Sequence, residues 1–146
     1  MDKHFEQPSA IERFVNGTIG WLVGVGVGPG YARLLTVRGR KSGKTFTTPV
    51  NLLDYDGKLW LVGARGETQW VRNAQAAGEV TLARGRDKRS YRVQRVPAAQ
   101  SAALLREYLE RYHSQVQRFF GAPRGASLPE FEAIADRHPV FELIAQ

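Results

Sequence analysis

Four cations lie within seven consecutive residues, 38–44, of the 146-residue chain, and two glycines stand among them. Residues 39–45 run Gly-Arg-Lys-Ser-Gly-Lys-Thr, and Arg38 comes directly before them. Glycines let backbone N–H groups turn toward a ligand, and such turns bind anions. Arginine adds a planar set of donors that suits phosphate and carboxylate oxygens. The stretch is therefore either a phosphate or polycarboxylate site or a solvated basic turn between strands, and composition alone does not decide between them.

The same segment resembles a nucleotide-binding P-loop but lacks two of its properties. A P-loop has four residues between its glycines and opens a helix whose N-terminus receives the phosphate. Only three residues separate Gly39 from Gly43, and residues 46–50 are typical of a strand. The glycines at 24, 26 and 28 lack the spacing of the dinucleotide-binding pattern. Both motif-based nucleotide sites are excluded.

A second basic zone lies on an expected hairpin around residues 85–87. Nucleic-acid binding by such a zone would normally involve interleaved aromatic rings, and only Tyr91 is present. A solvated hairpin is the favoured interpretation, and an extension of the first anion site along a long acidic ligand is a third. We expect no nucleic-acid partner. The zone contains Arg84, Arg86, Lys88, Arg89, Arg92 and Arg95.

The overall composition favours an anionic ligand and removes several classes of site. The net charge of +7 and the pI of about 10.1 suit phosphates, acidic cofactors or acidic surfaces. There is no cysteine, which removes thiolate metal sites, thiol catalysis and disulfides. The three histidines, His4, His113 and His138, lack ligand spacing, so we expect no metal. No signal peptide is recognisable, and a cytoplasmic location is expected, with a peripheral position on the inner face of the membrane as the alternative.

The elements that would position these stretches are mostly strands joined by tight turns. We expect strands at 34–37, 45–55, 59–64, 80–83, 91–96 and 140–144. Hairpin turns at 56–57 and 85–87 make neighbouring strands antiparallel. Helices are expected at 69–77, from 98 to about 120, and from 128 to about 135. This is a mainly β architecture, a β-roll or barrel of about six antiparallel strands with packed helices.

The first 30 residues are expected to form a separate N-terminal helix and a glycine-rich connector, with the barrel domain at 31–146. A capping pattern at 9–12 predicts the start of that helix. Residues 11–27 could contact a membrane surface or cap the barrel, and we favour capping. They are too short and too rich in glycine to span a bilayer.

Several of these motifs, in this order, resemble the signature of the deazaflavin-dependent nitroreductase family. The resemblance rests on residues 34–43 (LLTVRGRKSG), 47–50 (TTPV), 63–66 (GARG), 70–73 (WVRN) and 78–82 (GEVTL). It covers roughly residues 34–144. It implies a split β-barrel like that of FMN-binding flavoreductases, with coenzyme F420 as hydride carrier. That coenzyme is a deazaflavin with a phosphodiester and an oligoglutamate tail, so its negative charge suits a basic chain.

Carried over by residue, the resemblance implies three groups of cofactor contacts. The phosphate and tail would be held by the turn, the deazaflavin ring would lie along the following strand, and the neighbouring strand and short helix would close the site. Phe46 stands where many relatives carry a cation. The resemblance adds no catalytic side chain. The implied contacts are Arg40, Lys41, Ser42, Gly43, Phe46, Thr48, Pro49, Val50, Asn51, Ala64, Arg65, Gln69, Trp70 and Asn73.

The resemblance predicts an oxidoreductase that passes a hydride from reduced deazaflavin to an electron-poor acceptor. Quinones, enones, nitro compounds and unsaturated lipids are the candidate acceptors. Tyr112 is a candidate substrate contact, although its place on the apolar helix stripe favours a core role. The alternatives are an FMN- or FAD-binding oxidoreductase of the same fold and a non-catalytic cofactor-binding protein. Split barrels of this kind are often homodimers, and the sequence leaves the oligomeric state open.

Overall fold

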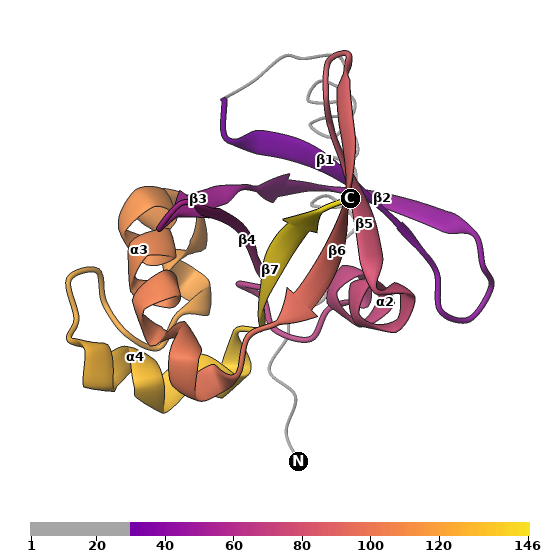
Figure 1. The fold of residues 1–146 in the computed structure, drawn as a ribbon. Coiled ribbons are helices and arrows are strands. Elements are labelled where there is room, and N and C mark those ends of the chain that lie inside the picture. The colour runs from indigo at the N-terminus through magenta and orange to yellow at the C-terminus, as the bar shows by residue number, and fades with distance from the viewer. Residues whose placement is uncertain (1–29) are drawn as a thin grey trace.

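Seven strands, three α-helices and two short 3₁₀ helices make up residues 30–146, which are the residues that the computed structural model describes (Figure 1). The expected N-terminal helix, its capping pattern and the residues proposed to cap the barrel lie outside this range. The strands are β1 (Ala32–Arg38), β2 (Thr45–Asn51), β3 (Leu53–Tyr55), β4 (Lys58–Val62), β5 (Glu79–Arg84), β6 (Asp87–Arg95) and β7 (Val140–Ala145). The helices are α2 (Gln69–Ala77), α3 (Ala98–Val116), η1 (Gln117–Phe119), α4 (Leu128–Ile134) and η2 (Ala135–Arg137).

The strands form one antiparallel sheet in the order β2-β1-β5-β6-β7-β4-β3. The two ends of that order, β2 and β3, are separated along the chain by Leu52 alone. One residue can join opposite edges of a seven-stranded sheet only if the sheet curls until those edges meet. The topology therefore makes the sheet a curled, barrel-like roll, as the sequence predicts.

The single strand expected at 45–55 is instead two strands, which raises the number of strands from six to seven. The N–H of Leu52 continues the β1–β2 register, whereas its carbonyl is bonded by a side chain of α3. Its N–H donates to the Tyr31 carbonyl at 2.9 Å, and its carbonyl accepts the Tyr112 hydroxyl at 2.7 Å. The chain turns there from its β1 partner to its β4 partner.

The turns and helix ends follow the sequence predictions. Asp56 and Gly57 both have positive φ, 56° and 72°, as the tight turn between β3 and β4 requires. Gly78 ends α2 in the left-handed conformation, with φ of 78°. At the start of α4, the Ser127 N–H donates to a Glu130 carboxylate oxygen at 3.1 Å.

Two apolar clusters form the core, and the long helix α3 packs in one of them while the short helix α2 packs in the other. The first packs α3 and α4 against β3, β4 and β7, on one side of the roll (Figure 1). The predicted stripe along α3 and η1 is buried in this cluster: Leu105, Leu109, Tyr112, Val116 and Phe119. The second lies among β1, β5, β6 and α2 and includes Leu35, Leu82 and Ala74. No helix within residues 30–146 is long and apolar enough to cross a membrane.

Candidate functional site

The basic stretch forms a closed turn between β1 and β2. Arg38 pairs with Thr45 at the last rung of the ladder, and the Gly39 N–H donates to the Lys44 carbonyl at 2.7 Å. The Gly43 N–H returns to the Gly39 carbonyl at 3.0 Å, with φ of 74° at Gly43. These bonds hold the backbone in a defined loop. The side chains of residues 41–44 are exposed on it, so they are free to meet a ligand.

Phe46 covers one of the glycines of this turn. A Cβ on Gly39 would lie 2.5 Å from Phe46 Cε2 and 3.1 Å from the Lys44 carbonyl oxygen. The ring therefore lies directly against the turn backbone, while 52% of the residue stays exposed. Phe46 places an apolar surface beside the turn, at the position where the resemblance led us to expect a cation. Its contact with a cofactor stays a prediction.

Arg40 is held in place by the short helix α2, about 30 residues further along the chain. The Asn73 side-chain oxygen accepts two bonds from Arg40, from the backbone N–H at 3.1 Å and from Nη1 at 2.7 Å. The Gln69 side-chain oxygen accepts Nη1 as well, at 3.0 Å. Asn73 is 4% exposed, so this contact is anchored in the core. We call Arg40, Gln69 and Asn73 the arginine clamp; the structure brings together these three predicted site residues.

The predicted ring-binding residues, 48–51, lie half-buried along β2. β2 is an edge strand, and its ladder partner is β1. Pro49 suits an edge because it has no N–H to donate to a further strand. The Val50 side chain packs against the second core cluster. The strand thus presents a firm, half-buried surface that runs from the turn toward Asn51.

The remaining predicted contacts are divided between the two cores. Trp70 is half-buried against the second cluster, with its ring centroid 6.2 Å from that of Phe141. Ala64 is buried in the first cluster. The Arg65 guanidinium lies over the Phe119 ring at 4.9 Å, also on the side of the first cluster. Arg65 and Ala64 therefore do not join the arginine clamp, and their cofactor contacts stay predictions.

Asn51 belongs to a polar network that the sequence did not reveal. Its amide donates to the Gln115 side-chain oxygen at 3.0 Å, and Gln115 donates to the Tyr31 hydroxyl at 2.8 Å. The Tyr31 ring centroid lies 4.7 Å from that of Tyr112, which in turn lies 4.9 Å from Tyr108. The only sequence signal was the position of Tyr108 one turn before Tyr112 on the same helix face.

Tyr112 is a core residue, as its place on the helix stripe favours. It is 4% exposed, and its hydroxyl donates to the Leu52 carbonyl. Desolvation on burial raises the pKa of this hydroxyl, and does the same for Tyr108. The backbone at Tyr112 departs from helical values, with φ of −119° and ψ of 20°. Its contact with a substrate stays a prediction.

A polar brace supports the loop that leads into α2. Arg95 Nη2 lies 2.6 Å from a Glu67 carboxylate oxygen, and its Nη1 donates to Gln75 at 2.8 Å. Arg72 Nε donates to the Glu67 carbonyl at 3.0 Å. The sequence analysis placed Arg95 in the basic zone of the hairpin. In the structure, Arg95 lies at the opposite end of β6 from the hairpin turn and pairs with Glu67. It therefore supports the helix that carries the clamp.

A sequence-family model described as F420H(2)-dependent quinone reductase matches residues 7–126. The chain belongs to this family. The chain is therefore an oxidoreductase that uses coenzyme F420, and the expected deazaflavin family, activity and cofactor are confirmed at that level. No curated protein sequence gives a significant match.

Solved structures support the split-barrel fold. The chain resembles an F420-H2 dependent reductase, FDR-A, with 20% identity over 82% of this chain and 99% of the other, at a TM-score of 0.55. It resembles a structure described as a domain-swapped dimer, with 16% identity over 92% and 99% of the two chains, also at 0.55. An FAD-binding protein from Mesorhizobium loti matches with 16% identity over 95% and 91%, at 0.50.

The turn of this family member has the donors that an anionic coenzyme needs. Coenzyme F420 carries a phosphodiester and carboxylates, and the turn offers guanidinium and ammonium groups beside a glycine-bounded backbone. Lys41 and Lys44 are exposed, and Arg40 is already oriented by the clamp. The residues present fit the coenzyme. Within residues 30–146 there is no group of three or more acidic, histidine or cysteine residues that could hold a metal.

Proposed function

We propose that this chain binds reduced coenzyme F420 along the turn and β2 and reduces a quinone at the end of the site near Asn51. The arginine clamp is the observation that carries the proposal. It holds the Arg40 side chain in one orientation before a ligand arrives, which would lower the ordering cost of binding a phosphate there.

The chain's own residues bind and orient. Arg40, Lys41 and Ser42 would hold the phosphate and the acidic tail, and residues 48–51 would support the ring along β2. Gln69, Trp70 and Asn73 would close the site from α2, with Ala64 and Arg65 at its border. When bound, the reduced coenzyme supplies the hydride for a two-electron reduction of the acceptor. The half-buried surface of β2 would limit the access of water to that end of the site.

Fluorescence titration with the oxidised coenzyme tests the binding site. We expect the double variant Arg40→Ala, Lys41→Ala to bind at least about tenfold more weakly, because charge-assisted bonds contribute about 1.5–3 kcal/mol each when desolvated. The matched control is Arg106→Ala, Arg137→Ala, which removes two exposed cations from α3 and η2. Equal losses in the two variants would reject the turn as the site.

The choice of acceptor is tested by turnover. We expect reduced coenzyme to be oxidised by a water-soluble quinone faster than by a nitro compound or an enone of similar size. Tight coenzyme binding without turnover of any acceptor would favour a cofactor-binding protein instead.

We further infer a homodimer, because within residues 30–146 β2 pairs on one side only and exposes Thr45, Phe46 and Thr47. One similar structure is a domain-swapped dimer. Light scattering on the eluting protein tests the assembly, and a monomer at all concentrations would reject it. A cysteine-free chain that uses a reduced cofactor also suits the cytoplasm, and we propose that location, which fractionation of cells tests.

A further inference from the structure

The end of the β5–β6 hairpin projects beyond the strands that flank it. β5 and β6 pair as far as Arg84 and Asp87, whereas β7 follows β6 only to Tyr91 and β1 follows β5 only to Ala83. The ribbon that remains is two strands wide, and Figure 1 shows it rising from the rest of the sheet. Residues 85–90 are all exposed.

This projecting end, residues 84–89, carries four cations and a single carboxylate. Arg84 and Arg89 lie on one face of the ribbon, Lys88 lies on the other, and Arg86 occupies the turn. Asp87 pairs with Arg89 at 3.1 Å between Oδ1 and Nε, and both side chains remain more than half exposed. We call residues 84–89 the cationic tip. Arg92 is excluded because it lies opposite Glu79 in the ladder.

The cationic tip lies at the other end of β1 from the basic turn. Arg84 Nη1 approaches the Ala32 carbonyl at 3.5 Å, and Ala32 pairs on its other side with Asn51. The basic turn follows Arg38, about 20 Å away along the strand. The tip is therefore not an extension of the site for the acidic tail, which was one of the interpretations of the sequence. It lies beside the end of the site where the acceptor would arrive.

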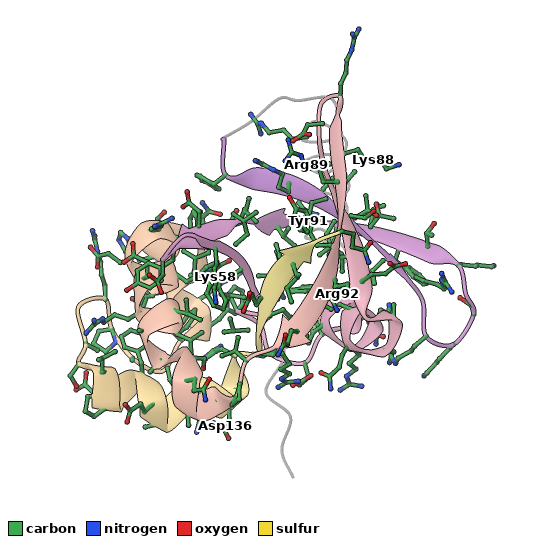
Figure 2. All side chains as sticks on the ribbon, viewed as in Figure 1. Lys58, Lys88, Arg89, Tyr91, Arg92 and Asp136 are labelled. Carbon is green, nitrogen blue, oxygen red and sulfur yellow. The ribbon has the colours of Figure 1, made fainter. Side chains whose placement is uncertain are left out.

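We propose that the cationic tip docks the enzyme on the anionic headgroups of a lipid bilayer. The proposal rests on the proposed reduction of a quinone, since a quinone with an apolar tail dissolves in the bilayer. Docking through the tip would turn the acceptor end of the site toward that membrane. Lys88 and Arg89 project from the part of the ribbon that would make the contact (Figure 2).

The side chains at the tip favour a bilayer over a nucleic acid. Single-stranded nucleic acids are bound by exposed aromatic rings on which bases stack. Tyr91, the aromatic residue nearest the tip in sequence, is buried at 9% exposure. The large hydrophobic residues exposed within residues 30–146, Phe46 and Tyr55, lie on other strands. The contact is therefore electrostatic, without an apolar side chain to insert, and added salt should weaken it.

Vesicle sedimentation with the full chain tests the proposal. The triple variant Arg86→Gln, Lys88→Gln, Arg89→Gln removes the exposed cations of the tip and keeps the Arg84 contact. Each basic residue near an anionic membrane contributes about fivefold, so we expect about a hundredfold weaker partitioning onto vesicles of phosphatidylglycerol and phosphatidylcholine. The matched control, Lys58→Gln, Arg106→Gln, Arg137→Gln, has the same net charge and should retain most of the binding.

Three results would overturn the proposal. They are no binding of the unaltered protein to anionic vesicles at low salt, equal losses in the two triple variants, and tip-dependent binding of DNA or RNA oligonucleotides that exceeds the vesicle binding. Turnover with a water-soluble quinone is measured in parallel and should be unchanged by the tip variant. If the unaltered protein does not turn over the water-soluble quinone, the proposed acceptor is rejected. The vesicle measurement does not depend on that result.

Discussion

Replacing Asn73 by alanine should loosen the basic turn from the helix that holds it. The substitution removes two bonds to Arg40, one from a backbone N–H and one from a charged guanidinium. A neutral bond contributes about 1 kcal/mol, and we assign a similar value to the charged one because Arg40 is only half-buried. The free energy of unfolding should therefore fall by about 2 kcal/mol, which lowers Tm by roughly 4–8 °C for a domain of this size.

The same change should weaken coenzyme binding, since a free Arg40 side chain must be ordered when the ligand binds. Ordering one long side chain costs about 0.5–1.5 kcal/mol, which predicts roughly a twofold to tenfold rise in Kd. Thermal unfolding and fluorescence titration measure the two effects. Gln100→Ala is the matched control, because it removes an exposed amide side chain from α3, outside both the clamp and the brace.

A second variant separates orientation from charge. Asn73→Asp keeps an acceptor for both bonds and adds a negative charge beside Arg40. It should unfold at or above the temperature of the unaltered protein yet bind the anionic coenzyme more weakly than Asn73→Ala does. The reasoning is refuted if Asn73→Ala behaves like Gln100→Ala in both measurements, because the clamp would then contribute neither stability nor orientation.

Three other changes test the supports of the site. Gly39→Ala should reduce the free energy of coenzyme binding by more than it reduces the free energy of unfolding. The new methyl group would displace the flexible Phe46 ring and press on the Lys44 carbonyl in the turn. Fluorescence titration and thermal unfolding measure the two changes. Arg95→Ala should raise the Kd of the coenzyme by a few fold without changing vesicle binding, as sedimentation can show. Tyr108 and Tyr112 have raised pKa values in the fold, so their contribution to stability is present below about pH 10 and is lost as pH rises further. Urea unfolding at alkaline pH should show that loss, and Tyr112→Phe should make it shallower.

The strands, turns and helix ends could be predicted because each depends on a few neighbouring residues. The positive φ values at Asp56 and Gly57 and the cap at Gly78 follow from local conformational preferences. The bend at Leu52 could not be predicted, since no glycine or proline marks it and its bonds come from Tyr31 and Tyr112. Distant polar partners of that kind have no signature in a single sequence.

In the candidate site too, features that depend on neighbouring residues could be predicted, and contacts between distant residues could not. The basic turn is visible as a run of charge and glycine, but its attachment to α2 is a contact between residues 40 and 73 that only the fold creates. Proximity along the chain also misleads. Arg95 follows the basic hairpin, yet it lies about 26 Å along β6 from the tip and pairs with Glu67. In a strand, a few residues are enough to move a charge to a different surface.

The bend at Leu52 has a consequence for how the chain folds. The hairpins β1–β2 and β3–β4 are adjacent in sequence, so each can form within microseconds, already joined at the bend. The roll is closed only when the β5–β6 hairpin pairs with β1 and β7 pairs with both β6 and β4, which brings together residues as distant as 34 and 83 or 59 and 143. These long loops are slow to close. The last step of folding should therefore be the pairing of β7 with β4, and the cofactor turn on β1–β2 should exist before the barrel does.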